Sequence, residues 1–167
     1  AVVVLARAIA TGSGDSLSGF SWGFTVAVPG GSGLPLFLDE FLAGGGVNAV
    51  AIADLNRDGN LDVLTTNENA GDVAVLLGSG NGRLAERVLY PAGSNAHSLC
   101  CGDFDSDSVL DVAAAASSGD SVAVLLGNGD GTFQSAVCYP TGDFPEDVRC
   151  ADIDLDGCLD LLTANAY

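Results

Sequence analysis

Short apolar runs separated by polar, glycine-containing turns recur along most of this chain. Residues 48–53 and 61–66 are runs of this kind, rich in β-branched and small apolar side chains, and residues 73–77 form a third. Short runs of such residues bounded by turn signals are typical of β-strands. A fourth strand is expected to end near Tyr90, so the pattern predicts four consecutive strands joined by hairpins.

The whole pattern repeats with a period of 49 residues. Residues 122–126 repeat the apolar run of residues 73–77, and a glycine-rich turn follows each run. The turns at residues 78–82 and 127–131 supply the positive φ that hairpins need, and neither contains the lysine of a phosphate-binding loop. Four-stranded units of about 40–50 residues are typical of β-propeller blades. We therefore expect an all-β fold built from propeller blades.

The period divides the chain into four parts, of which the first and the last are incomplete. Residues 46–94 and residues 95–143 are each expected to form a full blade, and residues 144–167 the first half of the next. Residues 1–45 are expected to form an incomplete first blade with an insertion at residues 12–24. About three blades of a partial propeller are thus predicted, and their open edges give the chain a route to self-association.

An acidic stretch of nine residues lies between the first two strands of each unit. Alternate residues of such a tight loop can supply the six to eight oxygen ligands that calcium, a hard cation, prefers. Side chains would come from positions 1, 3, 5 and 9 and a backbone carbonyl from position 7, so up to three Ca²⁺ ions are expected. The predicted ligands are Asp54, Asn56, Asp58, Asn60 and Asp62 in the first loop, Asp103, Asp105, Asp107, Val109 and Asp111 in the second, and Asp152, Asp154, Asp156, Cys158 and Asp160 in the third.

Two details of these loops refine the prediction. An EF-hand has a bidentate glutamate at loop position 12 and helices on both sides, whereas position 12 here is Thr65, Ala114 or Thr163 and the flanks are strand-like. Position 6 is glycine in the first and third loops, where the chain must turn sharply. Ser108 occupies this position in the second loop, which we therefore expect to be more strained or weaker in binding.

The charge of the chain excludes one large class of function. The 167 residues include 22 acidic residues against five arginines, a net charge of −17, which excludes nucleic-acid binding by phosphate neutralisation. A hydrophobic content of 48% argues against disorder. The three loops contain eleven of the 22 carboxylates, so bound calcium would offset charge where its density is highest. Without metal, the carboxylates are expected to repel one another and loosen the hairpins.

The cysteines and the opening segment suggest little chemistry of their own. The five cysteines form no CxxC pair, and Cys101 and Cys150 share one repeat position. We interpret these two as small apolar residues in strands rather than as disulfide partners. Residues 1–7 are apolar but too short to span a membrane, so no membrane span is expected in this chain.

Two motifs point to a known family. One is the acidic loop with its flanking strands in residues 50–64, and the other is the strand with its glycine turn in residues 122–133. Residues 46–167 closely resemble the FG-GAP (VCBS) repeats of integrin α-subunit propellers and their bacterial relatives. The resemblance implies a seven-bladed propeller in the full protein, with calcium in the hairpin between strands one and two of certain blades. It also implies an extracellular setting and a role in adhesion or recognition.

The expected function is therefore that of a calcium-binding propeller module for extracellular protein recognition or adhesion, in which the metals are structural. A protein or glycan ligand would contact loops on a propeller face. A lectin-like propeller and a non-catalytic accessory module of a larger secreted hydrolase are the alternatives. We expect no catalysis: residues 14–18 match the nucleophile motif of GDSL-type esterases, but the chain has a single histidine, His97, preceded at the third position by Ser94 rather than by that family's aspartate.

Overall fold

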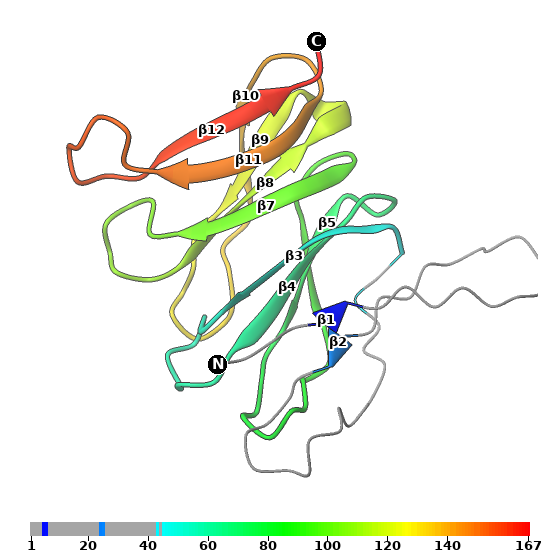
Figure 1. The fold of residues 1–167 in the computed structure, drawn as a ribbon, viewed down its shortest axis with the longest axis vertical. Coiled ribbons are helices and arrows are strands. Elements are labelled where there is room, and N and C mark those ends of the chain that lie inside the picture. The colour runs from blue at the N-terminus through cyan, green and yellow to red at the C-terminus, as the bar shows by residue number, and fades with distance from the viewer. Residues whose placement is uncertain (1–4, 7–23, 26–42, 44) are drawn as a thin grey trace, which may run out of the picture.

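The strands of this chain form antiparallel sheets, as Figure 1 shows for the computed structural model, which describes residues 5–6, 24–25, 43 and 45–167. The single helical element among these residues is one turn of 3₁₀ helix, η1 (Ser117–Gly119). No helix in this part of the chain has the length and hydrophobicity that crossing a bilayer requires. The prediction of an all-β fold is confirmed.

The first four-stranded sheet contains β3 (Val47–Ala53), β4 (Asp62–Asn67), β5 (Asp72–Leu76) and β6 (Val88–Pro91), which pair in chain order. The predicted strands of this unit are confirmed to within one or two residues. Every residue of β4 and β5 is buried, because these central strands are covered on both faces. Such double burial explains why neither sequence alternates between apolar and polar residues as a strand with one exposed face does.

The second four-stranded sheet repeats this arrangement with β7 (Ala96–Gly102), β8 (Asp111–Ala116), β9 (Ser121–Leu125) and β10 (Val137–Pro140). A register shift in the pairing of β7 with β8 lies near the start of β7, as the corresponding shift does in the pairing of β3 with β4. The two sheets are therefore alike in strand order and in local irregularity.

Two further pairs of strands complete the described structure. The strands β11 (Pro145–Ala151) and β12 (Asp160–Asn165) pair as the first two strands of each larger sheet do. Near the N-terminus, β1 (Leu5–Ala6) pairs with β2 (Phe24–Thr25). Most of the predicted incomplete blade and its insertion lies outside the described residues.

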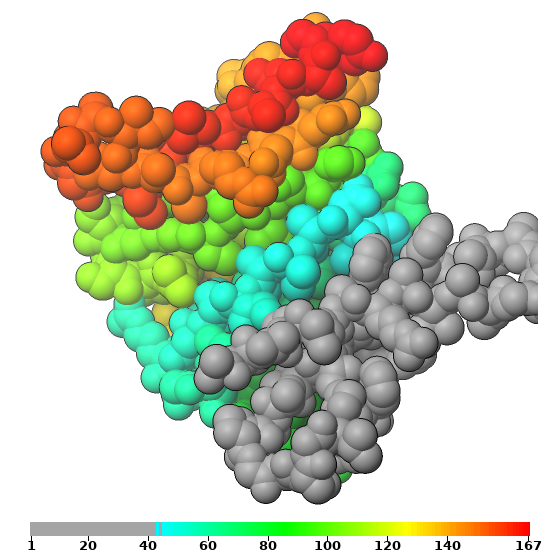
Figure 2. Space-filling model, viewed as in Figure 1, coloured from blue at the N-terminus to red at the C-terminus, as the bar shows by residue number. Residues whose placement is uncertain are grey.

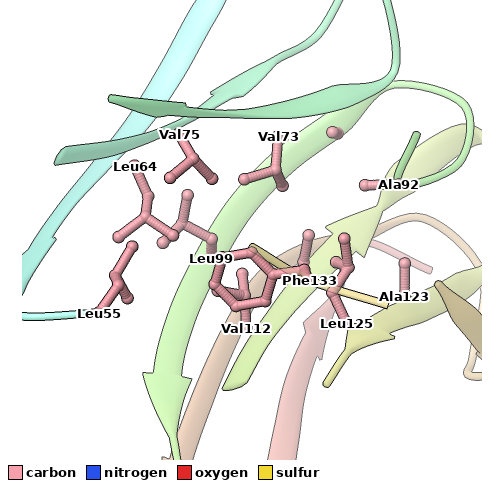
Figure 3. Packing of buried hydrophobic residues seen from close by; sticks show 12 residues of the cluster. Leu55, Leu64, Val73, Val75, Ala92, Leu99, Val112, Ala123, Leu125 and Phe133 are labelled. Atoms are coloured by element: carbon pink, nitrogen blue, oxygen red, sulfur yellow. The ribbon is translucent and has the colours of Figure 1, made fainter. Parts of the chain in front are cut away.

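The main hydrophobic core lies between the two four-stranded sheets. Figure 3 shows Leu64 and Val75 of the first sheet facing Leu99 and Leu125 of the second, with Phe133 among them. Leu64 is fully buried and Leu125 is 1% exposed. Burial of each such side chain stabilises the packing of the sheets by roughly 1.5–3 kcal/mol.

Consecutive sheets meet through equivalent repeat positions. The hydroxyl of Ser98 on β7 donates to the carboxylate of Asp147 on β11 at 2.5 Å, and these residues are 49 apart. Nδ1 of His97 lies 3.0 Å from the carbonyl oxygen of Glu146, which is again 49 residues further on. The first strands β3, β7 and β11 consequently follow one another across the view in Figure 1.

The face of β11 and β12 that points away from β7 has no described strand against it. Leu162 on β12 is 44% exposed, whereas Ala113, the equivalent residue of β8, is fully buried. This region forms the orange and red end of the space-filling view in Figure 2. The sheets thus form an open arc, as expected for part of a propeller.

Candidate metal centres

The three acidic loops connect the first two strands of successive sheets. They join β3 to β4, β7 to β8 and β11 to β12, and they follow one another along the left edge of Figure 1. Since the first strands lie side by side, a motif repeated in sequence is placed repeatedly on one edge of the fold. Most loop residues are exposed, while the first and last aspartates of the first two loops are buried or partly buried.

The first aspartate of each loop organises the backbone around it. Oδ1 of Asp54 accepts from the amide of Asp58 at 3.1 Å, and its Oδ2 accepts from the amide of Gly59 at 2.9 Å. Asp103 and Asp152 make the same two contacts with the amides at positions 5 and 6, at 2.8–3.1 Å. Identical contacts in three loops show that the loops share one conformation.

The aspartate at position 5 makes a smaller turn inside each loop. Asp58 accepts from the amide of Asn60 at 2.7 Å and from the side-chain amide of Asn56 at 3.1 Å. The backbone hydrogen bond from Asn60 is the main reason that the pKa of Asp58 lies below its ordinary value of 3.8, and the side-chain hydrogen bonds add to it. Asp107 and Asp156 accept the equivalent amide at 2.6 and 2.8 Å. All three carboxylates are therefore oriented by the backbone that follows them.

Position 6 is left-handed in all three loops. Gly59 and Gly157 have φ of 83° and 92°, and Ser108 has φ of 69°. The predicted need for a sharp turn at this position is confirmed, and Ser108 adopts the glycine conformation in spite of its Cβ. Position 4 is also left-handed, at Arg57, Ser106 and Leu155. The sequence gives no glycine signal there, so this second turn was not predicted.

The last aspartate of each loop has a structural role that sequence reasoning missed. Asp62 is fully buried, and its carboxylate accepts from the amides of Leu55 and Gly78, both at 2.8 Å. Gly78 begins the glycine turn after β5, so the contact ties the acidic loop to a second hairpin. A Cβ on Gly78 would lie 2.1 Å from the carbonyl oxygen of Leu61, which explains why glycine is required there. The glycine that directly follows the third apolar run was the one feature of the sequence that could have indicated this close contact between the two hairpins.

Asp111 repeats this role in the second loop. It accepts from the amides of Phe104 and Gly127, each at 2.8 Å. Burial raises the pKa of Asp111 above its ordinary value, although both hydrogen bonds lower it, and the charges of Asp105 and Asp107 add to the rise. Asp160, in the more exposed third loop, accepts from the amide of Ile153 at 3.0 Å. A cation beside these carboxylates would offset their repulsion.

Carboxylate oxygens converge in two of the three loops. One oxygen each from Asp103, Asp105 and Asp111 lie within 4.8 Å of one another, and the same holds for Asp152, Asp154 and Asp156. Each carboxylate oxygen offers about two acceptor sites, so the contacts with backbone amides leave room for a metal. Oxygen-only donor sets with several carboxylates fit calcium or magnesium.

The first loop has fewer carboxylates than the others. Position 3 belongs to both converging groups, and in the first loop it is Asn56, whose neutral amide oxygen replaces a carboxylate. The ligand assignments for all three loops, including the backbone carbonyls of Asn60, Val109 and Cys158, stay predictions.

Neighbouring loops touch one another. The guanidinium of Arg57 in the first loop donates to the backbone carbonyl of Ser108 in the second. The charge of Asp156 is the main cause that raises the pKa of the Cys158 thiol in the third loop, and the side chain of Ser106 in the second loop lowers it to a smaller degree. The three loops therefore form a continuous row.

The histidine considered for catalysis lies away from this row. His97 is on β7, where its ring contacts the backbone of β11. The esterase-like motif at residues 14–18 lies outside the described residues.

The sheets and their acidic hairpin loops define a class, that of β-propeller-type repeat proteins. The family model described as FG-GAP-like repeat matches residues 54–114 and again residues 103–163. The chain therefore belongs to the FG-GAP-like repeat family, and the resemblance seen in the sequence is confirmed. Each match begins at the first aspartate of an acidic loop. A search of curated proteins found no match.

Proposed function

We propose that this chain is a calcium-binding β-propeller module that serves protein recognition or adhesion outside the cell. The observation that carries the proposal is the convergence of three carboxylates in each of the second and third loops. Three loops with one conformation on one edge of the fold extend the argument to a series of sites. Family membership supports the propeller-type module, since two repeats match the chain.

The metals in this proposal are structural. Bound calcium would supply positive charge among carboxylates that otherwise repel one another. Asp62 and Asp111 would transmit this stabilisation, because their carboxylates connect the acidic loops to the turns at Gly78 and Gly127. Metal binding would thus hold the first, second and third strands of each full sheet in a fixed arrangement.

The edge and faces of the propeller leave exposed loops to contact a partner. A rigid sheet scaffold with variable surface loops is a common basis for recognition. The proposed partner is a protein or glycan outside the cell, where millimolar calcium would match the weaker class of such sites, with affinities of roughly 10⁻⁴–10⁻³ M.

Calcium titration by isothermal calorimetry, combined with thermal melting, tests the metal sites. The chelator-treated protein should bind up to three ions, and its melting temperature should rise with calcium concentration. At a free concentration of about 100 times Kd, one site should add about 2.7 kcal/mol to the free energy of unfolding. The absence of both heat and stabilisation would overturn the proposal.

Matched variants assign the sites. Asp105→Asn and Asp154→Asn each remove one carboxylate from a converging group, so each should abolish or weaken one site. Asp143→Asn removes an exposed carboxylate outside the loops and should leave the titration unchanged. An equal effect of all three variants would show that general surface charge, rather than the loops, binds calcium.

Partner class needs a separate measurement. A glycan array probed with the calcium-loaded chain tests the lectin-like alternative. Calcium-dependent binding to a defined set of glycans would favour that alternative over protein recognition.

A further inference from the structure

Two cysteines, Cys100 and Cys150, lie on the facing sides of the boundary between the second four-stranded sheet and the β11–β12 pair. Cys100 on β7 packs against the buried cluster around Val148, which lies at this boundary. Its neighbour Cys101 packs against the main core on the opposite face of β7. The alternation of side chains along a strand thus separates the two adjacent cysteines.

Cys150 on β11 points back toward β7. Its thiol donates to the backbone carbonyl of Cys101 at 3.4 Å. A Cβ placed on Gly102 of β7 would lie 3.5 Å from its Sγ. Burial is the main cause that raises the pKa of Cys100, and the neighbouring thiol of Cys150 raises it further.

We propose that Cys100 and Cys150 form a disulfide that links two consecutive sheets under oxidising conditions. The oxidant would be a small-molecule disulfide. One cysteine, as thiolate, attacks a sulfur of the oxidant, forms a mixed disulfide and releases one thiol. The second cysteine loses its proton, attacks the protein sulfur of the mixed disulfide and releases the second thiol. Two protein thiols are oxidised as one small-molecule disulfide is reduced to two thiols.

The other cysteines are placed differently. Cys101 faces the other side of β7, and burial raises its pKa to about 12. Cys138 lies exposed on the outer strand β10, and Cys158 lies in the third acidic loop. Cys100 and Cys150 are both partly exposed, so a small oxidant can reach them.

The disulfide would fasten the open end of the arc. It would close a loop of about 50 residues that contains the second acidic loop and three of the four strands of its sheet. Closing a loop of this length lowers the entropy of the unfolded chain and so stabilises the folded state. For a chain of this size, that stabilisation corresponds to a rise in melting temperature of roughly 8–15 °C on oxidation.

Disulfide mapping tests the proposal on the unmodified chain. The reduced protein is equilibrated with oxidised glutathione under native conditions, alkylated, and digested without reduction by a protease that cleaves after acidic residues. Asp103, Asp147 and Asp152 allow cleavage around the relevant peptides. Mass spectrometry should find the peptide of Cys100 and Cys101 joined to that of Cys150. Full alkylation of Cys150 after equilibration would overturn the proposal.

Variants identify which of the adjacent cysteines is linked. Cys101→Ser and the control Cys138→Ser should keep the link and the rise in melting temperature, and Cys100→Ser should lose both. Loss of the link in Cys101→Ser but not in Cys100→Ser would assign the bond to Cys101 and overturn the proposal. The circular dichroism of each reduced variant checks its fold, and the mapping of the unmodified chain stands independently of them.

Discussion

Replacement of Ser108 by glycine should stabilise the second acidic loop. Ser108 has φ of 69°, in the left-handed region, whereas the equivalent positions in the other loops are glycines. A side chain in this region costs about 1–2 kcal/mol. Glycine removes that cost but gives the unfolded chain about 0.5–1 kcal/mol of extra entropy. The net gain in the free energy of unfolding should be about 0.5–1 kcal/mol.

The free-energy cost of a side chain at loop position 6 comes from the backbone conformation and not from a steric clash. A Cβ added to Gly59 or Gly157 would meet no atom within 4 Å, so there is open space around position 6. The reverse substitutions Gly59→Ser and Gly157→Ser should therefore lose a similar amount of stability. Ser118→Gly is the control, because Ser118 is exposed and is not among the residues with positive φ. It should destabilise the protein by about 0.5–1 kcal/mol.

Urea unfolding of the chelator-treated protein measures these differences, and thermal melting provides a second reading. The gain expected for Ser108→Gly corresponds to a rise in melting temperature of about 1–4 °C for a chain of this size. A loss of stability equal to that of Ser118→Gly would refute the reasoning. It would mean that the loop pays no conformational cost for serine at position 6.

Three other substitutions test separate features of the fold. Asp111→Ala leaves the amides of two residues without their acceptor and should cost about 2–5 kcal/mol in urea unfolding, whereas Asp160→Ala, at an exposed site, should cost less than half as much. Hydrogen bonds from the hydroxyl and the amide of Thr132 hold the pKa of Asp130 below 3.8. These hydrogen bonds therefore stabilise the folded protein fully above pH 3.8, and their contribution is lost as pH falls through the lowered pKa of Asp130. Thr132→Ala should raise this pKa toward 3.8 in an NMR titration, and an unchanged midpoint would contradict the assignment. Gly71→Ala should lower stability by at least about 2 kcal/mol in thermal melting, because its Cβ would lie 2.2 Å from the carbonyl oxygen of Gly93 and φ is 68°. Unchanged melting would show that the turn at Gly71 can move away from Gly93 without loss of stability.

The strands of the full sheets could be predicted from the sequence because their apolar runs are short, bounded by turns and repeated. The central strands β4 and β5 are buried on both faces and show no alternation, so their short length, their β-branched residues and their flanking turns identified them as strands. The contacts between sheets could not be predicted in this way. Which residue of β7 meets which residue of β11 depends on how the sheets pack, as the pairing of Ser98 with Asp147 shows.

The acidic loops were predictable as units, but the several roles of their residues were not. The spacing of carboxylates indicated a metal loop, and the glycines at position 6 indicated its sharp turn. The spacing did not reveal that Asp62 also accepts from Gly78, since that amide is 16 residues away. Nor did it reveal that Cys100 and Cys150 lie on facing sides of two neighbouring strands, because a shared repeat position was visible only for Cys101 and Cys150.

The packing of consecutive sheets gives the arc a direction. Leu99 of β7 packs against the preceding sheet, whereas Ala113 of β8 packs against Val148 of β11, so the following face of one sheet meets the preceding face of the next. Packing of this kind, in which one face of a unit contacts the opposite face of the next, is called heterologous or head-to-tail when it occurs between subunits of an oligomer. Such packing forms a closed ring when the rotations between units add up to a full turn, and an open helix when they do not. A unit inserted in the reverse sense would bring two following faces together and lose these contacts. Every unit of the arc must therefore have the same orientation around it.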